Sequence, residues 1–310
     1  MKVNLIHFIT LLILGSQFSA SAEAKLKLVT TTPNLAFAAK AIAGDEAEVE
    51  SLLKGMEDPH FVDALPSFVL KAANADVLCF VGLELEVGWL PKVLSKSGNA
   101  KVQNGGKGFC DAGSTVEVLD KPAGAIDRSM GDVHSSGNPH YEISPRHLAQ
   151  ASKAITNALS ETLPNKALLF ESNRLKFVAE MKSLEAKTQE KLRRAFPSAE
   201  NAQILEYHKE FTYFLSAYGI KSLGSIEETP GVPPSAGRIA EVALQAKNLG
   251  ALLALASTHN PQKVLNRFAE VSGVPVVVVA TSILLPVKPE AYAELQNNLA
   301  EQILTRAKKK

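Results

Sequence analysis

The sequence predicts an α/β protein of two lobes, each with a parallel-sheet core, joined by one long α-helix. Three observations support this fold class. Residues 166–196 contain no glycine or proline, and apolar side chains recur there every three or four positions, as in an amphipathic helix. Short apolar segments alternate with helical patterns on both sides of this stretch. The chain of 310 residues is also long enough for two lobes of ordinary size.

The long helix is predicted to begin after Asn165 and to end at Pro197. Asparagine is favoured at helix N-caps, and proline commonly terminates a helix. At the usual rise, about 30 residues make a helix roughly 45 Å long, which is well above a typical globular helix. Its apolar spacing keeps no clean heptad, so we expect a rigid strut across two lobes and not a coiled coil.

The half of the chain before this helix alternates strand and helix patterns. Apolar periodicity predicts strands at 25–30, 48–53 and 77–81, and helices at 34–43, 66–75 and 145–163. Residues 98–139 are rich in glycine and are the least regular part of the chain. We expect a long loop there with one short strand at 115–119, and long loops in compact domains are often functional.

The half of the chain after the helix also alternates strand and helix patterns. Strands are predicted at 203–207, 220–223, 251–255 and 274–279, and helices at 210–218, 236–248, 261–272 and 289–308. The loop at 225–235 contains three prolines, which stiffen it. The two halves show no sequence repeat, so their similarity is one of architecture.

Residues 1–22 have the features of a cleaved signal peptide. Lys2 and His7 precede an apolar run at 8–14, and small residues lead to a predicted cleavage site near Ala22. The run is too short to span a bilayer, and with no cysteine near the cleavage site we expect no lipid anchor. The mature chain is therefore predicted to be an exported, soluble protein of a bacterial periplasm.

The net charge and the two cysteines say little about function. The formal net charge of +1 gives no indication of a nucleic-acid partner. Cys79 and Cys110 are the only cysteines in the sequence. They can pair in an oxidising compartment, but Cys79 also suits a buried strand position as a free thiol. The sequence leaves both possibilities open, because pairing depends on geometry.

Histidines are the side chains that most suggest chemistry. His60, His140, His208 and His259 follow predicted strands or lie in the long loop, on both sides of the predicted helix. Imidazoles that converge from separate strand ends can form a zinc site, and tetrahedral zinc needs one further ligand. Each signal alone is weak, because the Asp-Pro-His and Asn-Pro-His sequences that end at His60 and His140 are also turn patterns.

The other histidines have simpler interpretations. His7 lies in the predicted signal peptide, and His147 is expected on the surface of a helix. His134 lies in the irregular loop, and a histidine in such a position is usually an ordinary loop residue. The same holds for His259 taken alone.

Several segments form an ordered set. They include Asp-Pro-His at 58–60, Gly-Asp-Val-His and Gly-Asn-Pro-His within 131–140, and Tyr-His-Lys-Glu-Phe-Thr-Tyr-Phe at 207–214; further motifs lie at 66–67, 75–86, 234–237 and 257–262. This set resembles the solute-binding proteins of zinc and manganese ABC importers over essentially the whole mature chain. The resemblance implies two lobes at 23–163 and 197–310, a linking helix at 164–196, and a metal ion in the cleft. It also implies that His60, His140 and His208 are the first three ligands.

The sequence departs from this family pattern at the fourth ligand. Many members have a carboxylate after the last apolar strand, where this chain has no Asp or Glu at 279–283. A zinc-binding subgroup resembles this chain more closely, and this resemblance implies that the ligand comes from the proline-rich loop, where the candidates are Glu227 and Glu228. His259 or a water molecule remains an alternative.

The resemblance implies a non-enzymatic function. We expect a high-affinity Zn²⁺-binding protein that delivers zinc, its transported ligand, to the permease of an inner-membrane ABC importer, with a periplasmic metallochaperone as a further potential partner. We expect a monomer. The alternatives are a manganese-binding counterpart and an exported adhesin or metallochaperone. A zinc hydrolase is disfavoured, because the sequence has neither an H-E-x-x-H nor a G-x-S-x-G motif.

Overall fold

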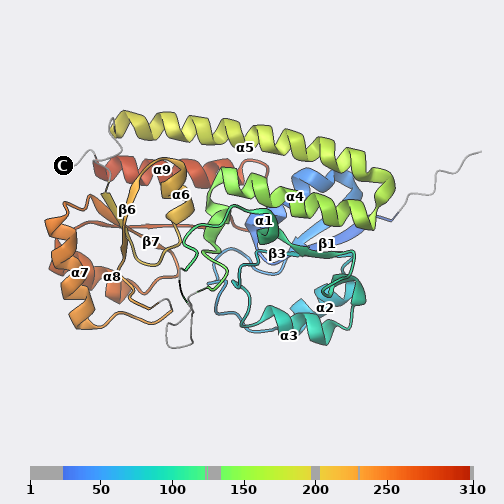
Figure 1. Ribbon diagram of the computed structural model, residues 1–310, viewed down its shortest axis with the longest axis horizontal. Helices are drawn as coiled ribbons and strands as arrows, with labels where there is room; N and C mark the ends of the chain where they lie inside the picture. The colour runs from blue at the N-terminus through green and yellow to red at the C-terminus, as the bar shows by residue number, and fades with distance from the viewer. Residues whose placement is uncertain (1–23, 123, 125–133, 197–202, 230, 308–310) are drawn as a thin grey trace, which may run out of the picture.

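The computed structural model describes residues 24–122, 124, 134–196, 203–229 and 231–307, and the predicted signal peptide lies outside them. The described residues form two four-stranded parallel sheets, which confirms the predicted fold class (Figure 1). The strand orders are β2-β1-β3-β4 and β6-β5-β7-β8. The strands are β1 (Leu26–Thr30), β2 (Ala47–Ser51), β3 (Val77–Phe80), β4 (Phe109–Asp111), β5 (Gln203–Glu206), β6 (Lys221–Ser225), β7 (Leu253–Ser257) and β8 (Val276–Val279).

Helices cover both sheets. In the first lobe they are α1 (Pro33–Ala43), α2 (Pro66–Asn74), α3 (Leu90–Ser97) and α4 (Pro145–Thr162), and in the second α6 (Thr212–Ala217), α7 (Ala236–Asn248) and α8 (Gln262–Ser272). Proline occupies the first turn of each of the four helices of the first lobe, where its missing N–H costs no hydrogen bond. No helix in the described part of the chain is long and apolar enough to cross a membrane.

The fourth strand of the first sheet differs from the prediction. It is β4, Phe109–Asp111, and the strand predicted at 115–119 is wrong. Glu117 donates its backbone N–H to the side chain of Gln150 on α4, and the Thr115 hydroxyl donates to the Gln150 carbonyl. This segment therefore bonds to a helix instead of a sheet. Cys110 of β4 lies opposite Cys79 of β3, and the two form a disulfide.

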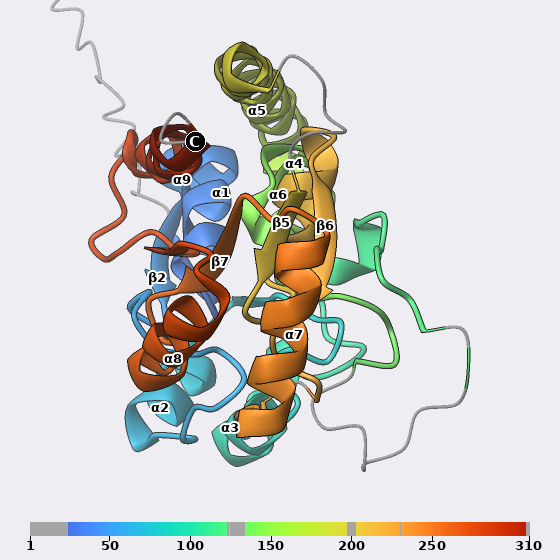
Figure 2. The same ribbon diagram turned by 90° about the vertical axis from the view of Figure 1, so that its left-hand side faces the viewer.

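The long helix is α5, Ala167–Ala195, with 29 residues. Its predicted N-cap is wrong. Asn165 lies in a 3₁₀ turn, Pro164–Lys166, and the helix begins one residue later than predicted, after Lys166 and without a side-chain capping bond. Lys166 instead pairs with Glu46 at 2.8 Å. Figures 1 and 2 show α5 as the outermost element above both lobes, with α4 and α9 beneath it.

A second element connects the lobes. Helix α9 (Ala291–Ala307) follows the second lobe in sequence and packs against α5. Near its start, the Tyr292 hydroxyl donates to the backbone carbonyl of Glu142 at 2.7 Å, and Gln296 donates to that of Ile143 at 2.7 Å. Both carbonyls belong to the first lobe. The C-terminal helix therefore ties the second lobe directly to the first.

His147 lies at the lobe contact and not on the helix surface as predicted. Only 4% of the surface of His147 is exposed. The ring Nδ1 lies 2.8 Å from the Ser144 hydroxyl, and the ring packs edge-on against Tyr213. Burial, with the nearby charge of Arg146, lowers the pKa of His147 to about 4. The prediction failed because the face of α4 that carries His147 is covered by the second lobe.

Candidate metal centre

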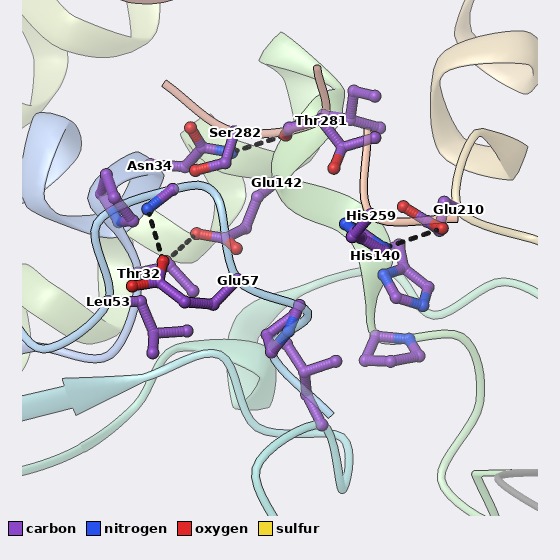
Figure 3. Close-up of a pocket in the computed structure, with 16 residues that line it drawn as sticks. Thr32, Asn34, Leu53, Glu57, His140, Glu142, Glu210, His259, Thr281 and Ser282 are labelled. Atoms are coloured by element: carbon purple, nitrogen blue, oxygen red, sulfur yellow. Dashed lines mark hydrogen bonds and ion pairs between the residues drawn. The ribbon is translucent and has the colours of Figure 1, made fainter. Parts of the chain in front are cut away.

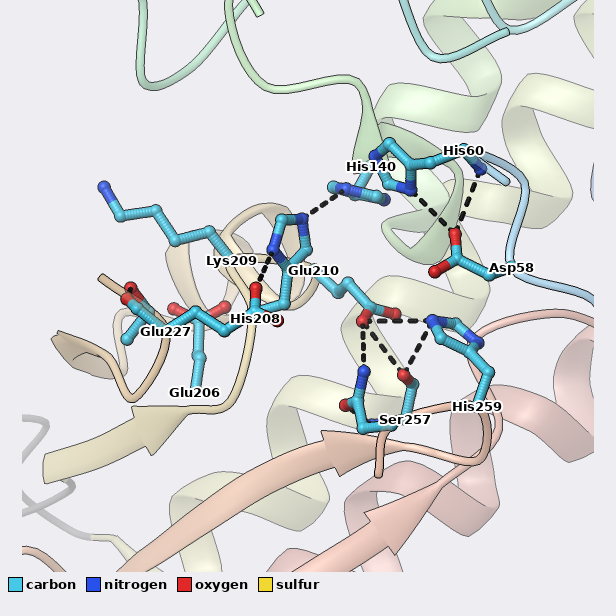
Figure 4. A network of polar contacts seen from close by, with 12 residues as sticks. Asp58, His60, His140, Glu206, His208, Lys209, Glu210, Glu227, Ser257 and His259 are labelled. Carbon is cyan, nitrogen blue, oxygen red and sulfur yellow. Dashed lines mark hydrogen bonds and ion pairs between the residues drawn. The ribbon is translucent and has the colours of Figure 1, made fainter. Parts of the chain in front are cut away.

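The carboxyl ends of the two sheets face one cleft, and three histidines meet there. His60 follows β2, His208 follows β5, and His140 begins the 3₁₀ turn His140–Ile143. One nitrogen from each of the three rings lies within 4.8 Å of the others, the only such grouping of three metal-binding side chains among the described residues. The Nε2 atoms of His140 and His208 are 3.2 Å apart (Figure 4). Loops that are distant in sequence thus bring together the three predicted ligands.

Distances within the cluster suit a zinc ion. Four nitrogens at the usual Zn–N distance of about 2.0–2.1 Å form a tetrahedron whose edges are about 3.4 Å long. The separation of 3.2 Å between the Nε2 atoms of His140 and His208 is close to such an edge. The arrangement can therefore hold a small cation with little movement of these two rings.

His60 is oriented by the turn that carries it. Asp58 accepts hydrogen bonds from both the backbone N–H of His60, at 3.0 Å, and its ring Nδ1, at 2.8 Å. The Pro59 carbonyl accepts from the indole of Trp89 at 2.8 Å, which anchors the turn. Burial opposes ionisation of Asp58, but the bond and charge of His60 outweigh it and lower the pKa of Asp58. The Asp-Pro-His sequence is thus both a turn and a support for the imidazole.

His208 has an equivalent carboxylate partner. Its Nδ1 lies 2.9 Å from Oε2 of Glu227, whose side chain is 9% exposed. Burial alone would lower the pKa of His208, but the Glu227 hydrogen bond and the charges of Glu210 and Glu227 outweigh it and raise the pKa. Glu227 therefore contacts a predicted ligand and lies outside the three-histidine grouping.

Glu228 is exposed and lines a cavity of about 220 Å³ together with His134, His140 and His208. The structure places it at the mouth of the cleft, outside the three-histidine grouping.

His140 is fixed through its backbone. Asn138 Oδ1 accepts from the His140 N–H at 2.9 Å, while Asn138 Nδ2 donates to the Lys209 carbonyl of the other lobe at 2.8 Å. One asparagine therefore positions His140 and links it to the residue after His208. Burial, followed by the charges of the neighbouring imidazoles, lowers the pKa of His140 well below its usual range.

His134 also reaches the cluster. Its Nε2 lies 3.2 Å from Nε2 of His60, and the two rings stack with centroids 5.3 Å apart. Burial, with the charges of His60 and His208, lowers the pKa of His134 to about 3. Sequence reasoning treated His134 as an ordinary loop residue. The one signal for it was its place in the Gly-Asp-Val-His segment six residues before His140.

His259 is engaged elsewhere in the cleft. Its Nε2 lies 3.3 Å from Oε1 of buried Glu210 and 2.9 Å from the Ser257 hydroxyl, which also donates to Glu210 (Figure 4). Burial alone would lower the pKa of His259, but Glu210 outweighs it and raises that pKa. His259 is therefore paired with a buried carboxylate, outside the three-histidine grouping.

A small cavity lies between this pair and the cluster. It measures about 50 Å³ and is lined by His140, Glu142, Glu210 and His259, among others (Figure 3). On its far side the Thr281 carbonyl accepts from the Asn34 amide at 3.1 Å. The segment after β8 thus contributes a backbone oxygen to a contact between the lobes.

Comparison with known proteins identifies relatives along nearly the whole chain. Residues 28–306 match the family model described as "Zinc-uptake complex component A periplasmic", ZnuA. The zinc-binding lipoprotein AdcA of Streptococcus pneumoniae is 26% identical over 272 residues, covering 86% of this chain and 51% of AdcA. This chain therefore spans about half the length of that relative. The manganese ABC transporter substrate-binding lipoprotein PsaA of Streptococcus pneumoniae is 29% identical over 261 residues, covering 80% of this chain and 78% of PsaA.

Solved structures share the fold. A crystal structure of ZnuA superimposes with a TM-score of 0.73 at 20% identity, covering 92% of this chain and all of that one. The periplasmic zinc-binding protein TroA from Treponema pallidum gives a TM-score of 0.74 at 20% identity, with 92% of this chain and 99% of TroA covered. An iron-transporter relative, MtsA of Streptococcus pyogenes, is 27% identical and covers 89% of this chain and 87% of MtsA. The similar proteins are thus named for different metals.

Proposed function

Because this chain belongs to the ZnuA family of periplasmic zinc-uptake components, we propose that it captures Zn²⁺ in the periplasm and delivers it to an ABC importer of the inner membrane. The family comprises solute-binding proteins of metal importers and not enzymes. The observation that carries the proposal is the convergence of His60, His140 and His208 from two lobes onto one point of the cleft.

The ligand atoms favour zinc over the other metals for which relatives are named. The grouped ligands are imidazole nitrogens without a carboxylate oxygen. Neutral imidazole suits zinc, whereas manganese prefers more oxygen ligands. The carboxylates of Asp58 and Glu227 bond to the Nδ1 atoms and leave Nε2 for the ion, which is the usual arrangement around zinc-binding histidines.

The proposed partners follow from the family. We propose that a membrane permease receives the ion and that the chain acts as a monomer, with a periplasmic metallochaperone as a potential source of zinc. In this proposal residues 1–22 direct export, and 23–163 and 197–310 act as the two metal-binding lobes on either side of the helix at 164–196.

A metal titration tests the proposal. Residues 23–310 would be purified, and their Zn²⁺ and Mn²⁺ affinities measured by competition with chelators. We expect one tightly bound zinc and weaker binding of manganese. His60→Ala, His140→Ala and His208→Ala should each lower the zinc affinity at least about 100-fold, because each removes a ligand.

The matched control is His259→Ala, which removes an imidazole from the same cleft but outside the grouping. Its zinc affinity should stay within a few-fold of the parent. Zinc affinity that ignores the three histidine substitutions contradicts the site. A parent protein that binds manganese more tightly than zinc favours the manganese-binding alternative.

A further inference from the structure

We propose that His134 is the fourth zinc ligand of this protein, so that the ion is held by four imidazoles, and that Glu84 is the residue that positions it. This inference rests on the proposed function. It replaces the carboxylates Glu227 and Glu228, the two candidates from the sequence, with a residue of the first lobe.

The ring nitrogens of His134 and His60 are close enough to share a metal ion. Nε2 of His134 lies 3.2 Å from Nε2 of His60, the same separation as between the Nε2 atoms of His140 and His208. Both values are close to the edge of about 3.4 Å expected for a zinc tetrahedron. Two opposite edges of such a tetrahedron are therefore already close to the required length. His134 lies outside the set of nitrogens that are within 4.8 Å of one another, so zinc binding has to draw its ring toward His140 and His208.

The available lone pairs also favour a metal ion at this contact. Nδ1 of His60 donates to Asp58, so the neutral ring carries its lone pair on Nε2, which faces His134. Nε2 of His134 faces this same atom at 3.2 Å. A bound cation accepts both lone pairs at once, which makes this contact suited to a metal.

The other candidate ligands of the cleft are bonded elsewhere or exposed. Glu227 bonds to Nδ1 of His208, and His259 is paired with Glu210. Glu228 is exposed. Among the described side chains of the cleft, His134 is the one beyond the three-histidine grouping whose nitrogen directly contacts a nitrogen of that grouping.

Hydrogen bonds of the neighbouring backbone hold His134 in position. The next residue, Ser135, donates its backbone N–H to Glu84 Oε2 at 2.6 Å, and its hydroxyl also donates to the Glu84 carboxylate. On the other side of the turn, the Gly137 N–H donates to the His134 carbonyl at 3.1 Å. A side chain at Gly137 would collide with Val118, since its Cβ would lie 2.2 Å from Cγ1. The backbone after His134 is thus held at two points.

The backbone of Glu84 supports a dedicated role. Gly82, Leu83 and Glu84 all have positive φ values, of 78°, 50° and 70°. Such values are uncommon for residues with a side chain, and they concentrate at functional sites. At Gly82 the bend needs glycine, because a Cβ there would lie 2.1 Å from Asp111 Oδ1. This bend follows β3 directly and turns the chain so that the Glu84 carboxylate meets Ser135.

The experiment combines affinity with a count of ligands. Zinc affinity would be measured by competition for the parent, His134→Ala, Glu84→Ala and the double variant, and zinc X-ray absorption would count imidazole ligands. We expect four imidazoles in the parent and three in His134→Ala, with an affinity loss of at least about 10-fold. Ser136→Ala, a change in the same segment, is the matched control and should behave as the parent.

The double variant separates positioning from general damage. If Glu84 acts by holding His134, Glu84→Ala should weaken zinc binding in the parent but have no further effect in the His134→Ala background. Additive losses in the double variant, or three imidazoles in the parent, overturn the inference. A parent that binds no zinc contradicts the proposed function itself, which distinguishes the two failures. Equal melting temperatures of the metal-free variants exclude unfolding as the cause.

Discussion

At the residue scale, the orientation of the cleft histidines depends on the residues to which they are hydrogen-bonded. Asp58 and Glu227 each bond to an Nδ1 atom, and Asn138 bonds to the backbone of His140. These contacts fix the rings before any ion arrives. A pre-set ligand geometry lowers the free-energy cost of binding, since fewer side-chain rotamers have to be lost.

These partners make a first prediction. Asp58→Asn and Glu227→Gln should each lower zinc affinity about 10- to 100-fold while the protein still binds one zinc. The histidine ligand stays in each variant, but its ring is less well oriented and its metal-binding nitrogen is less basic. Competition titration measures the effect, and Glu228→Gln, a change at the next and exposed residue, is the control. A loss in Glu228→Gln without one in Glu227→Gln assigns the direct contact to Glu228 instead.

A second prediction concerns pH. Protonation of an imidazole blocks metal binding, and Glu227 is among the groups that raise the pKa of His208, whereas the pKa of His140 is lowered. As pH falls, His208 therefore takes up its proton before His140 does, and this protonation lowers zinc affinity. In Glu227→Gln the pKa of His208 is lower, so this decrease should shift to more acidic pH. Zinc titrations between about pH 5 and about pH 8 measure the shift; an unchanged pH midpoint contradicts this role of His208.

The sequence could predict three of these histidines but not their partners. His60, His140 and His208 belong to motifs that a resemblance identifies. The contact of Glu227 with His208 depends on backbone pairing after β5 and β6, where Glu227 donates its N–H to the Tyr207 carbonyl at 3.0 Å. Ser135, the residue after His134, bonds to Glu84, which is 51 residues earlier in the chain. Neither contact is expressed in local sequence spacing.

At the element scale, most helices and strands follow from apolar periodicity, and the exceptions have local causes. The predicted strand at 115–119 has the right alternation, but its polar groups bond to Gln150 of α4. The edge position goes to β4 instead, which the disulfide fastens to β3. A short edge strand of three residues carries too little periodicity to be recognised in a glycine-rich loop.

A third prediction follows from this disulfide. It joins cysteines 31 residues apart, for which loop entropy predicts a contribution of about 4 kcal/mol to the free energy of unfolding. The variant Cys79→Ala, Cys110→Ala should therefore unfold at lower denaturant concentration than the oxidised parent. Reductant should destabilise the parent and leave the variant unchanged. Two free thiols titrated in the unfolded, unreduced parent contradict the pairing.

At the scale of the whole molecule, the three-histidine grouping lies between two lobes that are joined by α5 and by the contacts of α9. His60 and His140 come from the first lobe and His208 from the second. A zinc ion bound to all three adds a further connection between the lobes. The parallel sheets and the strut were predictable from the sequence. The return of α9 to the first lobe was not, because it depends on which backbone carbonyls remain free there.

A fourth prediction is that zinc stabilises the fold as a unit. A ligand that binds only the folded state adds about 4 kcal/mol at a concentration of 1,000 times its Kd. The melting temperature of the metal-free protein should therefore rise as zinc is added, in a single transition. In His208→Ala, which keeps both ligands of the first lobe, most of this rise should disappear. A full rise in that variant, or a transition of one lobe alone, contradicts an ion shared by both lobes.

The contacts of α9 also bear on how an ion would leave. Tyr292 and Gln296 bond to the backbone carbonyls of Glu142 and Ile143, two and three residues beyond His140. With this brace and α5 both in place, the lobes cannot swing apart as two halves of a hinged shell without breaking buried hydrogen bonds. The ligands consequently stay at a high effective concentration for one another after any single one lets go. We therefore expect an ion to leave by stepwise exchange of imidazoles for water or for an acceptor's ligands, at a rate set by the loops that carry the histidines.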